Sequence, residues 1–252
     1  MSRSSFRKRI RLFLLVFWLV VIAWMGWNMQ AHGVNGLTFE TSDTVRVTRE
    51  DHALVFKPST DTSATALIFY PGALVDPDAY APIARAVAEA GFPVHILHVP
   101  WRLAPLASQE STLFDRTLAR MAEHPEREWV VGGHSRGGAL AAEFAFRNAD
   151  ILSGLLLVGT SHPRERDLSG LRIPVTKISA SNDGLASPAE VREFAGNLPS
   201  ETTFITIEGG NHSQFGSYGW QLGAGSATID RDEQQRQALA AIRRLLEWVS
   251  NG

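Results

Sequence analysis

The chain has 252 residues, of which 44% are hydrophobic and 20% are charged, a balance that is typical of one folded α/β domain and excludes a disordered chain. It contains no cysteine, which excludes a disulfide framework, a thiolate nucleophile and a cysteine-ligated metal. Five basic residues precede the first acidic residue, Glu40, and removing them changes the formal net charge from −2 to −7, so we expect no nucleic-acid partner, because phosphate binding needs a basic face.

A long apolar segment follows those basic residues. From Leu12 to Trp27 the chain has no charged side chain. A helix of this length spans roughly 24 Å, and a tilted or thinned bilayer accommodates the difference from a hydrocarbon core of about 30 Å. We therefore expect residues 12–27 to lie in a membrane, with residues 1–30 forming a cytoplasmic basic tail and a transmembrane signal-anchor.

A cleaved signal peptide is the alternative for this segment. Signal peptidases need small residues at the cleavage site, whereas residues 24–30 read WMGWNMQ. Trp24 and Trp27 suit the interfacial aromatic belt of a membrane-spanning helix instead. The positive-inside rule keeps the basic tail in the cytoplasm, so the body, beyond a predicted linker at residues 31–44, is expected on the extracytoplasmic side. Cleavage near Ala31 would instead give a secreted protein.

Strand and helix patterns alternate from residue 45 to the end of the chain. Strands are predicted at residues 45–49, 53–56, 66–70, 94–99, 129–132, 154–158, 175–179 and 203–207, and helices at residues 79–90, 112–124, 137–148, 188–197 and 233–249. Most of the strands are continuous apolar runs, as in parallel strands buried on both faces. The sequence predicts an α/β fold with a mostly parallel central sheet and helices on both faces. Residues 159–173 are too few for a large helical lid.

The loop after the strand at 129–132 carries the most specific motif. Gly133, Ser135 and Gly137 form a Gly-x-Ser-x-Gly pattern between an apolar strand and an alanine-rich helix. This is the context of a nucleophile elbow, in which the glycines allow a tight turn and the serine hydroxyl is presented at the start of the helix. Ser135 is the predicted nucleophile, and an incidental serine in a glycine-rich turn is the alternative.

Two further loops supply partners for such a serine. Asp183 follows the strand at 175–179, and His212 follows the strand at 203–207. The chain order Ser135, Asp183, His212 is the one that accompanies an elbow of this kind. His212 is the predicted base and Asp183 the predicted acid that orients it; Asp150 and Asp167 are rivals, but neither directly follows the expected strand.

Backbone amides are expected to stabilise an oxyanion beside this serine. The first donor is the residue after the nucleophile, Arg136, and the second comes from the loop after the strand at 66–70. That loop reads Tyr70-Pro71-Gly72-Ala73, and proline has no N–H, so Gly72 or Ala73 must donate. We favour Ala73.

Other residues near these loops have open roles. His134 and the Arg136 side chain flank the nucleophile and either contact substrate or support the elbow. Trp101 either forms a pocket wall or lies in an ordinary connection. The loop at residues 213–228 either shapes the substrate site or packs on the surface.

Residues 133–137, Asp183, His212 and the loop at 70–73 resemble the α/β-hydrolase superfamily, particularly its compact dienelactone-hydrolase-like branch, the alpha/beta hydrolase fold-5 group. The resemblance covers roughly residues 45–250 and makes residues 45–252 the expected catalytic domain. It implies a Ser-His-Asp hydrolase of ester-type bonds without metal or organic cofactor. Dienelactone hydrolases carry a cysteine where this chain has Ser135, so their particular chemistry is not implied.

The sequence thus predicts a membrane-anchored serine hydrolase that cleaves carboxylic esters, small or lipid, through an acyl-enzyme. A non-catalytic binding protein on the same fold is one alternative, although such a protein is expected to lose a triad member and none is missing here. A serine peptidase or thioesterase is another, although this short chain leaves little room for the additional domain that peptidases commonly carry.

Overall fold

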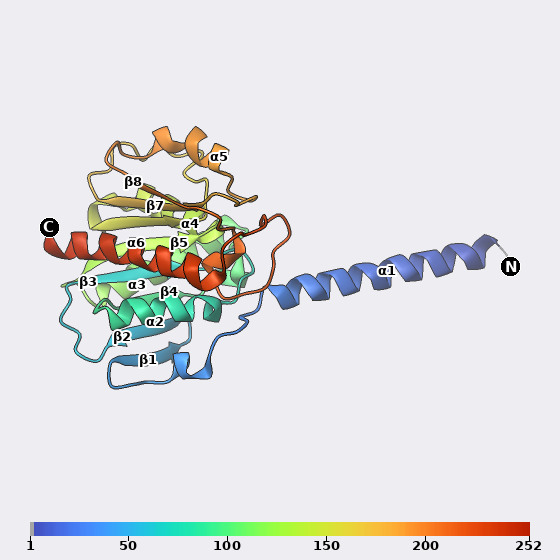
Figure 1. Ribbon diagram of the computed structural model, residues 1–252, viewed down its shortest axis with the longest axis horizontal. Coiled ribbons are helices and arrows are strands. Elements are labelled where there is room, and N and C mark those ends of the chain that lie inside the picture. The colour runs from blue at the N-terminus through green and yellow to red at the C-terminus, as the bar shows by residue number, and fades with distance from the viewer. Residues whose placement is uncertain (1–2) are drawn as a thin grey trace.

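The computed structural model describes residues 3–252 (Figure 1). Residues 1–2 of the predicted basic tail, and the side chains of residues 3–6 and 8, lie outside the described part of the chain. The strands are β1 (Val45–Glu50), β2 (Ala53–Pro58), β3 (Thr65–Tyr70), β4 (Val94–Leu97), β5 (Glu128–His134), β6 (Gly154–Val158), β7 (Val175–Ala180) and β8 (Thr203–Ile207). They form one sheet in the order β1-β2-β4-β3-β5-β6-β7-β8.

The sheet is parallel from β4 to β8, and β2 pairs in the antiparallel sense with both β1 and β4. The predicted mostly parallel sheet and its edge hairpin are confirmed. Every residue of β3 and β6 is buried, as expected for central parallel strands covered on both faces. β8 is the exception, because it lies at an edge and only Ile207 in it is buried.

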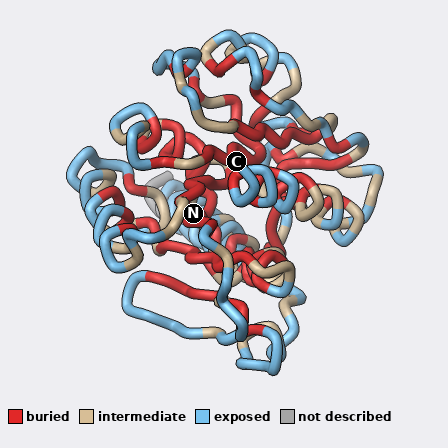
Figure 2. Tube along the Cα trace, turned by 90° about the vertical axis from the view of Figure 1, so that its left-hand side faces the viewer, coloured by how far each residue is buried: buried red, intermediate tan, exposed pale blue. Residues whose placement is uncertain are grey.

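Helices cover both faces of the sheet. One face packs against α2 (Ala81–Glu89) and α6 (Arg231–Asn251), and the other packs against α3 (Ala107–Ala122) and α4 (Arg136–Arg147). The short helix α5 (Pro188–Glu193) follows β7. Figure 2 shows the buried residues gathered through the centre of this layered body. The alternation of strands and helices therefore gives the two-faced α/β architecture that the sequence predicts.

Helix α3 begins five residues earlier than the apolar periodicity indicated. Its first turn is polar and carries no apolar stripe, so the pattern becomes visible only from Leu113 onward. The side chain of Gln109 accepts a hydrogen bond from the Leu106 N–H at 3.3 Å, which caps the start of the helix. Capping of this kind fixes a helix boundary that hydrophobic periodicity does not report.

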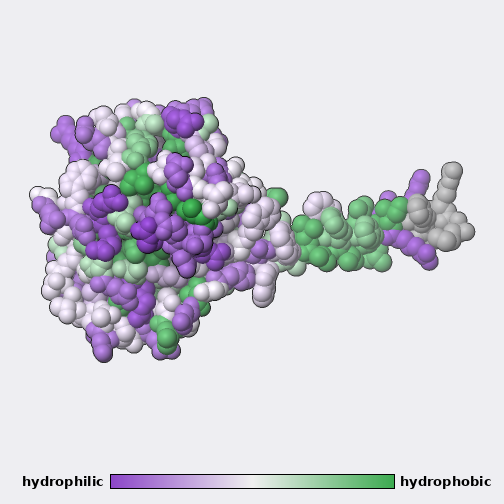
Figure 3. Space-filling model, viewed as in Figure 1, coloured by the Kyte–Doolittle hydropathy of each residue, from purple (hydrophilic) through white to green (hydrophobic). Residues whose placement is uncertain are grey.

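The amino-terminal helix α1 (Arg3–Asn28) projects away from the body (Figure 1). Its stretch from Arg9 to Asn28 is long and apolar enough to cross a membrane. In Figure 3 the hydrophobic colour covers the part of this helix toward the body, whereas polar side chains cover much of the body. Residues 31–44 fold onto the body: Ala31 bridges to Tyr218, and Phe39 packs against the core.

The topology places the loops that follow the six parallel strands at one edge of the sheet. Ser135 follows β5, Asp183 follows β7 and His212 follows β8. Ligand sites of open α/β sheets lie at this carboxyl edge. Candidate residues from distant parts of the sequence are brought to the same edge by the parallel arrangement alone.

Candidate active site

The turn between β5 and α4 is unusually tight. Ser135 has φ 55° and ψ −118°, a left-handed conformation that a non-glycine residue rarely adopts. A Cβ on Gly133 would lie 2.4 Å from the backbone carbon of Gly137, and a Cβ on Gly137 would lie 2.0 Å from the Tyr70 carbonyl oxygen. Both positions therefore require glycine, and the turn holds Ser135 at the start of α4.

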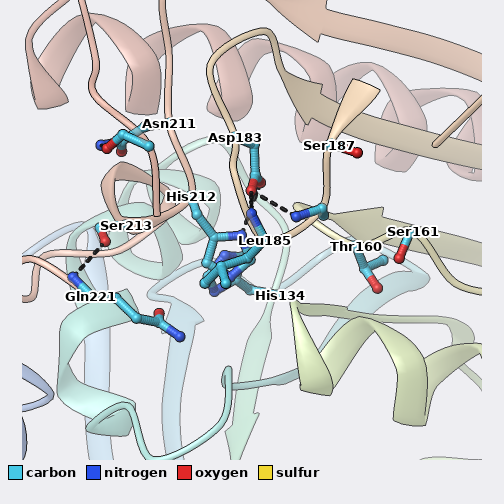
Figure 4. Close-up of polar contacts among 12 residues, drawn as sticks. His134, Thr160, Ser161, Asp183, Leu185, Ser187, Asn211, His212, Ser213 and Gln221 are labelled. Atoms are coloured by element: carbon cyan, nitrogen blue, oxygen red, sulfur yellow. Dashed lines mark hydrogen bonds and ion pairs between the residues drawn. The ribbon is translucent and has the colours of Figure 1, made fainter. Parts of the chain in front are cut away.

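Asp183 and His212 meet in the interior of the carboxyl edge (Figure 4). His212 Nδ1 lies 2.8 Å from Asp183 Oδ2, and both side chains are almost completely buried. The other carboxylate oxygen of Asp183 accepts the backbone N–H groups of Leu185 and Ala186, each at 2.8 Å. These bonds fix the orientation of the carboxylate toward the imidazole.

The two rival acids lie elsewhere. Asp167 is exposed, and its side chain accepts the backbone N–H of Ser169 at 2.9 Å. Asp150 is exposed in the short 3-10 helix Ala149–Ile151 that follows α4. Of the three predicted candidates for the acid, only Asp183 bonds the His212 ring among the contacts of the described residues.

Ser135 and His212 line the same hollow, a pocket of about 220 Å³. The other residues that line it are Arg136, Ala139, Gly159, Thr160, Ser161, His162, Arg164, Leu185 and Ala186. Within the described chain, His212 Nε2 has no hydrogen-bond partner, and none is formed between it and the Ser135 hydroxyl. An unpaired ring nitrogen in this place is free to bond the hydroxyl or a substrate, and such bonds commonly tighten only when substrate binds.

His134 supports the elbow from inside the protein. Its ring lies 4.6 Å from the His212 ring between centroids, and its Nδ1 lies 2.8 Å from the Tyr80 hydroxyl. Tyr80 in turn accepts the Gly72 N–H at 3.0 Å. Tyr80 thus links the elbow to the loop after β3, and of the two sequence interpretations for His134 this geometry favours support over substrate contact.

The His134 ring is held neutral by its surroundings. Burial, reinforced by the positive charge that His212 can carry, holds the pKa of His134 well below its ordinary value. The Tyr80 oxygen already accepts a bond from Gly72, so its hydroxyl can donate to His134 Nδ1. A neutral His134 adds no positive charge beside His212.

Two backbone N–H groups near Ser135 are available to donate hydrogen bonds to a substrate. Within the described residues, the N–H groups of Arg136 and Ala73 have no hydrogen-bond acceptor, while that of Gly72 is used by Tyr80. Arg136 lies in the first turn of α4, where N–H groups point out of the helix. The sequence allowed Gly72 or Ala73 as the donor from the loop after β3. Among the described residues, the Ala73 N–H is the one of the two that has no acceptor.

The structure also places the residues whose roles the sequence left open. The Arg136 guanidinium bonds the carbonyls of Leu103 and Ala104 and pairs with Glu110 at 2.6 Å, so it holds a loop. Trp101 is 82% exposed and does not line the pocket. In the loop at 213–228, the Phe215 ring lies 5.5 Å from the His134 ring and packs behind the site.

Sequence reasoning missed Tyr80 and the two amides that hold Asp183. Tyr80 is 54 positions from His134, and no local pattern signals their contact. An aspartate in a turn often accepts the backbone N–H groups two or three residues later. The two amide bonds to Asp183 could therefore have been predicted from the stretch Asp183–Ala186. Within the described residues, no group of three or more His, Asp or Glu side chains is arranged to hold a metal ion.

Comparisons with known proteins point to one family. Residues 66–236 match the sequence model of a family described as the alpha/beta hydrolase family. No curated protein matches the chain. Among solved structures, a bacterial heroin esterase is similar at 18% identity and TM-score 0.60, covering 90% of each chain.

Two structures from metagenomic libraries are also similar. A dienelactone hydrolase-like promiscuous phosphotriesterase shares 15% identity at TM-score 0.62, over 82% of this chain and 99% of that one. A cold-adapted esterase from an Arctic intertidal library shares 16% identity at TM-score 0.56, over 82% and 96%. At these identities the likeness establishes the fold.

The close approach at Gly137 gives a stability test. Gly137→Ala forces a Cβ against the backbone at Tyr70, which cannot move without disrupting β3. We expect a loss of about 3 kcal/mol or more in the free energy of unfolding, at the upper end of overpacking effects. Urea unfolding of the full-length chain in detergent measures it. Gly196→Ala is the matched control, since a Cβ there meets nothing within 4 Å, and equal midpoints for the two variants would contradict the described elbow.

Proposed function

This chain belongs to the alpha/beta hydrolase family and is a hydrolase, and from that premise we propose that it is a membrane-anchored serine hydrolase that cleaves carboxylic esters through an acyl-enzyme. The observation that carries the proposal is the 2.8 Å bond between His212 and Asp183 beside an elbow serine in the same pocket. Ser135, His212 and Asp183 are the proposed nucleophile, base and orienting acid.

The proposed reaction has two steps. His212 Nε2 takes the proton of the Ser135 hydroxyl as its oxygen attacks the ester carbonyl, and the protonated His212 then gives that proton to the departing alcohol. Water repeats the sequence on the acyl-enzyme and releases the acid. Asp183 holds the proton of His212 on Nδ1, so that Nε2 faces the serine in the basic form.

Charge that develops on the carbonyl oxygen needs fixed donors. The N–H groups of Arg136 and Ala73, unpaired within the described part of the chain, are the proposed oxyanion hole. Gly72 is not proposed, because its N–H already bonds Tyr80. His134 contributes by remaining neutral, since a second positive charge 4.6 Å from the His212 ring would oppose its protonation.

The pocket and the relatives favour an ester substrate. The hollow of about 220 Å³ is lined by the proposed nucleophile and base together with small, basic and apolar residues, among them Thr160, Ser161 and Arg164. Two of the similar structures are described as esterases. A pocket of this size accommodates the reacting end of a substrate and leaves any long chain outside it.

Membrane anchoring by α1 is part of the proposal. The candidate span Arg9–Asn28 contains the charge-free residues 12–27, roughly 24 Å of helix, and a tilted or thinned bilayer accommodates the difference from the core of about 30 Å. Met29, directly after it, is buried in the core, and Ala31 pairs with Tyr218. Cleavage near Ala31 would remove Met29 from the fold, so these contacts favour an uncleaved anchor. The basic residues that precede the apolar stretch favour a body on the extracytoplasmic side.

The nucleophile is tested by Ser135→Ala. We expect p-nitrophenyl ester turnover to fall by about 10⁴ to 10⁶, with urea unfolding unchanged and labelling by a fluorophosphonate probe lost. Ser161→Ala, which removes another hydroxyl from the same pocket, is the control and should keep the labelling. Turnover retained in purified Ser135→Ala would assign the nucleophile to another residue. A parallel panel of thioesters and peptides tests the other acyl-transfer classes.

The acid is tested by Asp183→Asn. The asparagine oxygen can still accept the N–H groups of Leu185 and Ala186, but its NH₂ group then faces His212 Nδ1 and favours the wrong tautomer. We expect kcat to fall about 10⁴-fold, by analogy with the same change in a serine protease. Asp167→Asn, at an exposed turn, is the control; a rate above a tenth of wild type in Asp183→Asn would refute the assignment.

Membrane topology is tested with the full-length chain in its host membrane. We expect it to stay with membranes through salt and carbonate washes, because the apolar segment at residues 12–27 is held by the hydrocarbon core. Protease should reach the body only from the extracytoplasmic face. Recovery of a soluble protein whose first residue is Ala31 or His32 would establish a cleaved signal instead.

A further inference from the structure

Helix α1 joins the body without a flexible connection. The apolar stretch ends at Asn28, and the next residue, Met29, is only 8% exposed and belongs to the core. The Met29 carbonyl accepts the Asp76 N–H at 2.8 Å. One residue covers at most about 3.6 Å of chain, so the part of the body around Met29 must lie at the membrane surface if α1 spans the membrane.

Contacts on two sides hold the joint in one orientation. The Asn28 carbonyl accepts the Gly219 N–H at 2.7 Å, and its side-chain oxygen accepts the Trp220 N–H at 3.1 Å. On the other side, Arg102 donates to the Gln30 side chain at 3.3 Å. The Trp220 ring also lies 6.0 Å from that of Trp24 in α1, between centroids. Because α1 is held from both sides, the body presents one chosen face to the membrane.

That face is the carboxyl edge of the sheet, where the pocket opens. Asp76 lies in the loop after β3, Arg102 in the loop after β4, and residues 217–220 in the loop after His212. In Figure 1, α1 leaves the body beside the loop that follows β8, on the side opposite the carboxyl terminus. Two of the loops that fix α1, those after β3 and β8, also carry the proposed catalytic groups Ala73 and His212.

Large apolar side chains are exposed to solvent along this edge. We call them the apolar rim: Leu74, Trp101, Leu106, Leu185, Trp220 and Leu222, each at least 38% exposed. Trp101 is the most exposed of them, at 82%. Exposed apolar side chains around a binding site indicate a surface that binds an apolar partner, such as a lipid membrane. Tryptophan in particular favours the membrane interface.

Backbone strain holds two rim residues outward. Leu74 has φ 63° and Trp101 has φ 55°, a region that such bulky residues rarely adopt. The Leu74 N–H donates to the Arg102 carbonyl at 2.6 Å, and Arg136 holds the following carbonyls of Leu103 and Ala104. Strain of this kind persists where surrounding contacts impose it, and it gathers at functional sites.

Resting on the proposed anchor and hydrolase function, we propose that the apolar rim lies against the outer lipid surface and that the enzyme takes its substrate from the bilayer, as an amphipathic ester whose apolar chain stays at the membrane. The rim contacts the lipid, and the ester group enters the pocket at Ser135. An open pocket suits this arrangement, because only the polar end of the substrate must leave the membrane.

The placement is tested without any enzymatic readout. The chain has no cysteine, so Trp101→Cys and Trp248→Cys each give a single site for an environment-sensitive bimane label. Trp248 is the matched control, because it is 52% exposed and lies near the carboxyl terminus. Both variants are reconstituted, full length, in phosphatidylcholine vesicles that carry a lipid-attached nitroxide quencher.

We expect the label at position 101 to be quenched by the nitroxide lipid and to emit at shorter wavelength, and the label at 248 to do neither. Equal, water-like emission at the two positions in protein that remains anchored would overturn the placement and leave the proposed function standing. Absence of turnover and of fluorophosphonate labelling in wild type would instead refute the proposed function, whatever the labels report.

Substrate source is tested by a ratio of activities. Turnover of 4-methylumbelliferyl palmitate in phosphatidylcholine vesicles is divided by turnover of soluble p-nitrophenyl acetate. Trp101→Asn, in which asparagine tolerates the left-handed backbone, should lower this ratio about tenfold, since burial of one large apolar side chain is lost. Trp248→Asn should leave the ratio unchanged. An unchanged ratio in Trp101→Asn would overturn delivery from the bilayer.

Discussion

Gly137 packs so closely on the end of β3 that a side-chain carbon there would stand 2.0 Å from the Tyr70 carbonyl oxygen. This contact presses the start of α4 against the loop after β3, and it places Ser135 in a left-handed turn between them. The amides of Arg136 and Ala73, which have no acceptor among the described residues, belong to those two segments. One backbone contact therefore sets the geometry of the proposed nucleophile and of both proposed oxyanion donors.

The charge arrangement around the elbow is consistent with that geometry. His212 is paired with Asp183, whose second oxygen is held by two amides. His134, beside it, is buried and bonded to Tyr80, and its lowered pKa keeps it uncharged. Of the two adjacent imidazoles, His212 is the one that bonds a carboxylate among the described residues. The neighbourhood thus distinguishes the proposed base from its supporting residue.

The same loops connect the site to α1. Arg102 donates to both the Gln30 side chain and Asp76, and its carbonyl accepts the Leu74 N–H next to Ala73. The end of the apolar helix is therefore only a few hydrogen bonds away from the proposed oxyanion loop. If α1 is the proposed membrane anchor, an attachment of this kind orients the pocket as well as tethering it, which a flexible linker at residues 31–44 would not do.

The sequence by itself determined the sheet, the elbow and the apolar helix, because each depends on a local pattern: continuous apolar strands, glycines two residues from Ser135, and a long stretch without charge. The order of Ser135, Asp183 and His212 along the chain also allowed these three residues to be predicted as one group. Only the tertiary structure decided that Tyr80 supports His134, that Arg136 holds a loop, and that Asn28 packs on Gly219 and Trp220. Tyr80 and His134 are 54 positions apart in the chain, and Asn28 and Trp220 are 192 positions apart. The fold of the parallel sheet brings such distant residues together, and neither segment carries a periodic pattern that would predict the contact.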